Sequence, residues 1–153
     1  LDKAVWENDF PFRSIQGYSA NVKSLYGKHF ALLGNAAEFL DPVFSSGVTI
    51  ALHSAKLAAD LLAKQLEGGA ADWDAEFAKP LMIGVNAFRT YVDGWYDLRF
   101  QNVVYAPNRS PEISRMISSI LAGYAWDTEN PFVAKSEQRL STLAALVGDL
   151  KIE

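Results

Sequence analysis

Residues 34–48 limit the fold and function of this chain more than any other segment. They read Gly-Asn-Ala-Ala-Glu-Phe-Leu-Asp-Pro-Val-Phe-Ser-Ser-Gly-Val. A short apolar run over 30–33 precedes them, and an alanine- and leucine-rich helical pattern over 49–66 follows. This order predicts a strand, a glycine turn at Gly34, a loop and a helix. It places backbone N–H groups and a helix N-terminus at the carboxyl end of a strand, where α/β folds bind anionic or polar cofactors.

The segment resembles the C-terminal flavin motif of the FAD-dependent monooxygenase superfamily. The common family form is Gly-Asp-Ala-Ala, followed by Asp-Pro and by a glycine that opens a helix. The ending Phe-Ser-Ser-Gly-Val at 44–48 is similar to the flavin-dependent halogenases and their relatives. The resemblance implies FAD as the cofactor. It also implies that the chain is the C-terminal segment of a FAD/NAD(P)-binding α/β fold of the p-hydroxybenzoate hydroxylase-like kind.

Three polar or turn-forming residues of the motif gain roles from this resemblance. In the family, the residue at the place of Asn35 hydrogen-bonds a ribityl hydroxyl of FAD, and an amide can do so as well. Asp41 and Pro42 begin the loop that passes the isoalloxazine ring. The alternatives are local: Asn35 could satisfy its own backbone in a turn, and Asp41 could cap nearby N–H groups.

The end of the motif, residues 46–48, is expected to contact the flavin ring. The N–H groups of Ser46, Gly47 and Val48 should face the pyrimidine edge of the ring, where negative charge appears on reduction. In halogenases, the pair equivalent to Ser46 and Gly47 offers a halide site beside the flavin. Hydroxylases and reductases carry the same loop without a halide, so halide binding stays open here. With Gly34, these residues complete the predicted cofactor site, and the sequence assigns no catalytic residue.

The rest of the pattern predicts a mainly α chain with one or two strands. By the same resemblance, residues 1–66 hold the end of a substrate-domain sheet and the FAD-binding strand-loop-helix, and 67–153 form a C-terminal helical region. A strand is expected over 14–20. The strand at 30–33 should be buried on both faces, and the helix over 49–66, which is apolar nearly all round, should be largely buried.

Capping signals predict where the later helices begin and end. Asp72 offers an N-cap for a second helix, which should kink or restart at Pro80 and continue to Tyr105. The other signals are helix starts at Ser110-Pro111 and Asn130-Pro131, and helix ends at Gly68 and Gly123.

Composition excludes several classes of protein. The net charge of −4 and the pI near 5.2 argue against a nucleic-acid partner. The absence of cysteine excludes disulfides and thiolate metal sites. His29 and His53 lack the spacing of metal ligands, so no metal site is predicted, and His53 is interpreted as a core or interface histidine. No apolar run reaches membrane-spanning length and no signal peptide is recognisable, so a cytoplasmic location is expected.

The beginning of the chain bears on its function. It starts at Leu1 and contains no Gly-x-Gly-x-x-Gly, the ADP-binding fingerprint of such enzymes. We therefore expect a C-terminal piece of a longer protein, with the N-terminal remainder as its partner and with little activity alone. A hydrophobic or aromatic small-molecule substrate is expected from a set of aromatic residues that could line a pocket or serve as core. That set is Trp95, Tyr96, Phe100, Tyr105, Tyr124 and Trp126.

Two other functions remain open on the sequence alone. A flavin reductase or dehydrogenase of geranylgeranyl-reductase type would use the same motif without O₂ chemistry. A non-catalytic helical interaction domain would explain the helices and the acidic charge, but it would not explain the motif at 34–48.

Overall fold

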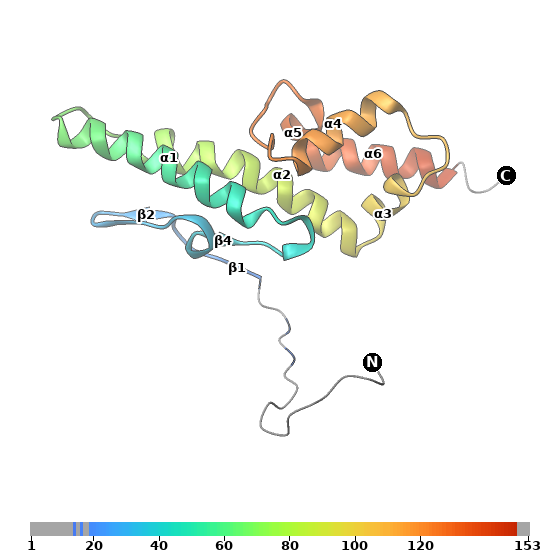
Figure 1. Cartoon of the computed structure of the whole chain (residues 1–153), viewed down its shortest axis with the longest axis horizontal. Helices are drawn as coiled ribbons and strands as arrows, with labels where there is room; N and C mark the ends of the chain where they lie inside the picture. Colours follow the sequence, from blue (N-terminus) through green and yellow to red (C-terminus); the bar gives the residue numbers. More distant parts are fainter. Residues whose placement is uncertain (1–13, 15, 17–18, 150–153) are drawn as a thin grey trace, which may run out of the picture.

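The computed structural model describes residues 14, 16 and 19–149, and this part of the chain is mostly helical with a few short strands (Figure 1). The described strands form two antiparallel pairs, in which β1 joins β4 and β2 joins β3. Their bounds are β1 Ala20–Asn21, β2 Tyr26–Gly27, β3 Phe30–Ala31 and β4 Glu38–Phe39.

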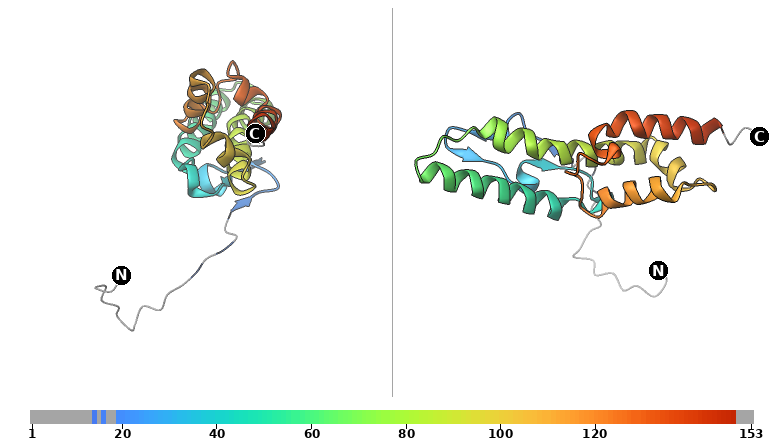
Figure 2. Two further views of the ribbon diagram at one scale, coloured as in Figure 1. Left: turned by 90° about the vertical axis from the view of Figure 1, so that its right-hand side faces the viewer. Right: turned by 90° about the horizontal axis from the view of Figure 1, so that it is seen from above.

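Two long helices organise the molecule. Helix α1 and helix α2 lie side by side and run in opposite directions, and the strands lie along α1 (Figures 1 and 2). Four further helices gather around the C-terminal half of α2. The α-helices are α1 Gly47–Leu66, α2 Lys79–Tyr96, α3 Arg99–Val104, α4 Pro111–Leu121, α5 Pro131–Ala134 and α6 Ser136–Asp149. The shorter turns are η1 Gly34–Ala36, η2 Pro42–Phe44 and the π-helical turn η3 Asp74–Ala78.

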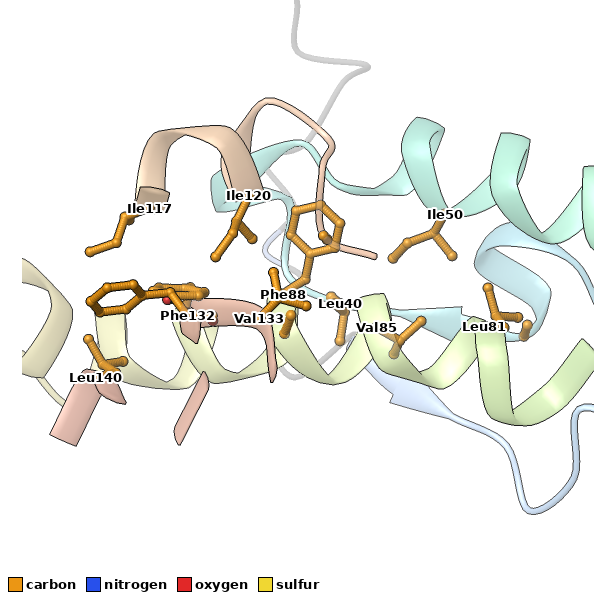
Figure 3. Close-up of a cluster of buried hydrophobic side chains, with 14 of the residues drawn as sticks. Leu40, Ile50, Leu81, Val85, Phe88, Ile117, Ile120, Phe132, Val133 and Leu140 are labelled. Atoms are coloured by element: carbon orange, nitrogen blue, oxygen red, sulfur yellow. Dashed lines mark hydrogen bonds between the residues drawn. The ribbon is translucent and has the colours of Figure 1, made fainter. Parts of the chain in front are cut away.

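One hydrophobic core joins the motif segment to the C-terminal helices (Figure 3). Leu40 and Ile50 contribute from the motif side, and α2 contributes the inward face that carries Leu81, Val85 and Phe88. Residues on both sides of position 66 therefore share this core. The division into 1–66 and 67–153 stays a prediction.

Most predicted helix boundaries are confirmed. The Asp72 carboxylate accepts hydrogen bonds from the amides of Asp74 and Ala75, both at 3.0 Å. Ser110 Oγ accepts one from Ile113 N, and Gly68 and Gly123 adopt positive φ just beyond helix ends. The helix does restart near Pro80, because the π-helical turn η3 leads directly into α2.

The prediction of one continuous helix to Tyr105 is wrong. Helix α2 ends at Tyr96, Leu98 adopts a left-handed φ of 72°, and α3 begins at Arg99. The Asp97 side chain accepts the amide proton of Arg99 at 3.0 Å and so starts the new helix. The apolar spacing continues across the break because Phe100 returns to the same core.

The expected burial of α1 and of the 30–33 strand is also wrong. Only one face of α1 is buried, through Ile50, Ser54, Ala58 and Leu61, and Phe30 and Leu33 are exposed. Leu62 on α1 lines a hollow together with Phe30 and Leu33, so these apolar side chains border open space rather than the core. The strand predicted over 14–20 is not seen at Ser14, Gln16 or Ser19, and β1 begins only at Ala20. Residues 15, 17 and 18 of that prediction lie outside the described residues.

Candidate functional site

A hollow of about 400 Å³ lies between the loop after β4 and the start of α1. Residues of the motif make up most of its lining, and the predicted site residues lie there together, with one exception, Gly34. Those lining the hollow are Asn35, Asp41, Pro42, Ser46, Gly47 and Val48. The sequence therefore identified a set of residues that the fold brings to one place, although they come from a turn, a loop and a helix.

Gly34 has a different part in the site. It is buried, its φ is +53°, and a Cβ there would lie 3.0 Å from the Cβ of Ala51 on α1. Its amide donates to the fully buried Ser54 Oγ at 2.9 Å, and Ser54 Oγ donates to Ala51 O at 3.0 Å. The predicted glycine turn is confirmed, and its function is to seat the turn against α1. Ser54 was not predicted as a site residue, because its only signal in the sequence is a hydroxyl within an alanine-rich helix.

The loop that begins at Asp41 is held by its own side chain. Asp41 Oδ1 accepts a hydrogen bond from Val43 N at 2.9 Å, and Pro42 starts the short η2 turn. The local alternative for Asp41, a cap for nearby N–H groups, is therefore present in the structure. Ser45 then adopts a left-handed φ of 53°. That conformation is uncommon for a residue other than glycine and is often found at functional loops.

The start of α1 presents unpaired donors to the hollow. Ile50 N donates to Ser46 O at 3.0 Å, which makes this the first helical hydrogen bond. Within residues 19–149, the amides of Gly47 and Val48 donate to no protein acceptor. Free amides at the positive end of a 20-residue helix favour an anion or an electron-rich group.

Asn35 and Gly47 meet at the edge of the hollow. A Cβ on Gly47 would lie 3.1 Å from Asn35 Oδ1, closer than side chains usually pack. The side chain of Asn35 is exposed and forms no hydrogen bond with the described residues. The local alternative, in which this side chain satisfies its own turn, is therefore not what the structure shows.

A buried ion pair near the motif was not predicted. Glu38 in β4 is 4% exposed, and its Oε2 accepts a hydrogen bond from Arg89 Nη2 of α2 at 2.7 Å. Arg89 Nη1 also donates to Asn86 Oδ1 at 3.0 Å. The sequence did carry a signal for a buried charge, because Glu38 is the only charged residue in the otherwise apolar segment 36–40. Its partner, 51 positions away, could not be found without the fold.

The predicted aromatic set does not form one pocket. Phe100 and Trp95 pack edge-on against Phe44 of the motif, with ring centroids 5.6 and 5.8 Å apart. Trp126 stacks on His53 with centroids 3.9 Å apart. Tyr96, Tyr105 and Tyr124 are exposed. Core packing therefore explains the first group. His53, predicted as a core or interface histidine, is partly buried against Trp126.

Charge and metal chemistry at the site are limited in the described part of the chain. Burial, followed by the charge of Lys56, lowers the pKa of His53. No group of three or more His, Cys, Asp or Glu side chains among the described residues could hold a metal ion. No described helix is both long enough and apolar enough to cross a bilayer.

Comparison with known proteins gives several partial matches in sequence, while no family model matches the chain. It is 50% identical over 48 residues to a 1H-pyrrole-2-carbonyl-[peptidyl-carrier protein] chlorinase of Pseudomonas fluorescens, covering 31% of this chain and 11% of that protein. It is 33% identical over 73 residues to a flavin-dependent halogenase of Armillaria mellea, covering 48% of this chain and 14% of that protein.

A solved structure matches far more of the chain. It is the crystal structure of a flavoprotein/dehydrogenase from Cytophaga hutchinsonii, which superimposes with a TM-score of 0.85 at 44% sequence identity. The match covers 88% of this chain and 33% of that one. The chain therefore spans about a third of the solved flavoprotein and a smaller share of the two curated relatives.

Proposed function

We propose that this chain, which is homologous to flavin-dependent halogenases, supplies the ring-side part of an FAD site in an FAD-dependent oxidoreductase of halogenase or monooxygenase type. One observation carries the proposal: residues of a turn, a loop and a helix start line a single hollow into which unpaired amides are free to donate. In this proposal the chain is the C-terminal segment of a p-hydroxybenzoate hydroxylase-like fold. The N-terminal remainder binds the ADP part of the cofactor, and 67–153 covers the substrate.

The residues present fit a flavin. The amides of Gly47 and Val48 would donate to the electron-rich pyrimidine edge, and the Asn35 amide would bond a ribityl hydroxyl. Because Gly47 has no side chain, a flat ring has room to approach the backbone there. Asp41 would act through the loop, because its carboxylate is already engaged by Val43 N. Bound FAD would supply the redox chemistry, passing electrons from its reduced ring to O₂ or to a substrate.

Replacing Gly47 by valine tests the proposal. In the full-length protein, the Gly47→Val variant should purify without the flavin absorbance bands, because a branched side chain would enter the hollow beside Asn35. Gly148→Val is the matched control, since a Cβ at Gly148 meets nothing within 4 Å. A Gly47→Val protein that is folded and fully yellow would show that the hollow is not the flavin site.

The 153-residue chain by itself should bind FAD weakly or not at all. The proposed contacts reach only the ring and the ribityl chain, so the affinity gained from the remote half of the cofactor would be lost. Quenching of FAD fluorescence on titration with the chain measures this. Sub-micromolar affinity would mean that the cofactor site has been misplaced.

A halide site at Ser46 and Gly47 is a second candidate function. It is supported by the burial of Ser46, which is 4% exposed, beside the unpaired Gly47 amide at the helix start. The dipole contribution of about 0.3–1 kcal/mol suggests millimolar rather than micromolar affinity.

The halide candidate is tested on full-length enzyme supplied with FAD, a reductant and O₂ at matched ionic strength. A phenol probe should be halogenated with chloride or bromide and unchanged with sulfate. Release of free peroxide without any halogenated probe would favour a monooxygenase function. Reduction of a substrate without O₂ consumption would favour a flavin reductase function.

A further inference from the structure

A second hollow lies in the C-terminal helices, apart from the motif. It has a volume of about 230 Å³ and lies between α3, α4 and α6. None of its lining residues belongs to the hollow beside Gly47. Its walls are mostly apolar and include Phe100, Val103, Ile117, Leu121, Leu143 and Val147.

Polar contacts outside the cavity hold its walls in place. Arg99 at the start of α3 bonds Glu137 and Ser141 of α6, the latter at 2.7 Å. Asn130 Nδ2 donates to Met116 O at 2.8 Å and so holds α4 against the start of α5. The Arg99 bonds therefore join α3 to α6, two of the three helices that line the cavity, and the Asn130 bond joins the third, α4, to α5.

The rim of the cavity carries an uncommitted cation. Arg109 lines it and forms no ion pair with any described residue. Asn108 and Ser114 add neutral polar groups to the lining, whereas Ser110 Oγ is already engaged as the cap of α4. An apolar chamber with one planar guanidinium at its rim suits a ligand with an apolar body and a carboxylate.

We propose that this cavity binds a small aromatic carboxylate that has either a single ring or two fused rings. An engineered apolar cavity of about 150 Å³ in another protein accepts benzene, so the larger space here fits a fused pair. The ring would lie between Phe100, Ile117 and Leu143, and the carboxylate would pair with Arg109. Phe100 also packs edge-on against Phe44 of the motif, with centroids 5.6 Å apart. A bound ring would therefore touch a side chain that supports the loop beside the motif hollow.

The test uses 2-naphthoate as the probe and 2-naphthylmethanol as its uncharged counterpart, both titrated calorimetrically into the full-length protein. Naphthoate should bind saturably below about 1 mM. Ser114→Phe, which fills the cavity, should weaken both probes by about tenfold or more, whereas Leu146→Phe, at an exposed position of α6 outside the lining, should bind as the parent does. Arg109→Gln should weaken naphthoate by about tenfold and leave the alcohol unchanged. Arg139→Gln, an exposed arginine on α6 without an ion pair to the described residues, is the charge control.

Several results would overturn the proposal. They are a lack of saturable naphthoate binding, undiminished binding in a folded Ser114→Phe variant, or equal effects of the Arg109 and Arg139 substitutions. If Ser114→Phe does not fold, amide shift changes caused by naphthoate in the unsubstituted protein decide instead. Shifts centred on Phe100, Ile117 and Leu143 support the site, and shifts elsewhere reject it. None of these readouts depends on flavin, so the outcome is independent of the proposed function.

Discussion

Helices α1 and α2 are neighbours of similar length, with 20 and 18 residues, but they are buried very differently. Helix α1 leaves large apolar side chains in solvent, with Val48, Leu52 and Leu66 at 72%, 70% and 78% exposure. Helix α2 turns most of its apolar residues into the core shared with α1 and α3 to α6. Both sequences are rich in apolar residues, so hydrophobicity alone does not distinguish a helix that holds this structure together from one that presents a surface.

This difference in burial fits the roles proposed for the two segments of the chain that contain these helices. Helix α2 is the centre of a structure whose described buried polar side-chain atoms all have hydrogen-bond partners. Helix α1 has one face on that core and a second face on which Val48, Leu52 and Leu66 stay mostly exposed. In the function proposed above, this second face of α1 would meet the N-terminal remainder of the protein.

The largest expected effect separates a leucine on α2 from one on α1. Leu81 is fully buried, so Leu81→Ala should lower the free energy of unfolding by about 2–5 kcal/mol through lost burial and a residual cavity. Leu52 is 70% exposed in this chain, so Leu52→Ala should change it by about 0.5 kcal/mol or less. Chemical denaturation of the 153-residue chain measures both. Equal losses would show that α1 is as deeply packed as α2 in solution.

The same pair of leucines sharpens the comparison in the full-length protein. If the outer face of α1 is covered there, Leu52→Ala should become more costly in the long protein than in the chain alone, while the cost of Leu81→Ala should stay similar. A Leu52 effect that is small in both proteins would leave the outer face of α1 without a partner.

A smaller effect is expected where α1 supports the motif. Ser54→Ala removes the acceptor of the buried Gly34 amide, which should cost about 1–3 kcal/mol. Thr142→Ala is the control, because its hydroxyl also donates to a helix carbonyl but is exposed on α6. Denaturant midpoints of the two variants give the comparison. If the two substitutions cost the same, the buried Gly34–Ser54 bond does not stabilise the turn.

The local parts of the fold could be predicted from the sequence, and the long-range parts could not. Caps at Asp72 and Ser110 and the turn at Gly34 follow from the chemistry of a few adjacent residues. The break at Leu98 escaped prediction because neither glycine nor proline marks it, and because the core demands apolar residues on both sides. The Glu38–Arg89 pair and the exposure of α1 depend on which surfaces meet, which periodicity does not encode.

The candidate site shows the same division. The motif identified the residues of the hollow because they are close in sequence and end at a helix N-terminus. It gave no indication of Ser54, which fixes the turn from 20 residues away. Nor did it indicate the cavity near Arg109, whose walls come from three separate helices.

The smallest predicted effect concerns His53, which lies on α1 and stacks on Trp126 in the turn after α4. Burial and the nearby charge of Lys56 lower the pKa of His53 from its usual 6.5. Below that value the unfolded chain takes up a proton that the folded chain resists. The contribution of His53 to the free energy of unfolding is therefore full above about pH 6.5 and is lost as the pH falls through the lowered pKa.

His53→Phe keeps an aromatic ring against Trp126 and removes the charge, so its stability should fall less than that of the parent between about pH 7.5 and about pH 5.5. Because the two proteins differ only at residue 53, the difference between their two slopes reports on His53, with His29→Phe as the control. Identical slopes for the parent and His53→Phe would mean that the stack on Trp126 tolerates a charged imidazole. His53 would then behave like an exposed side chain, although it lies between α1 and the C-terminal helices.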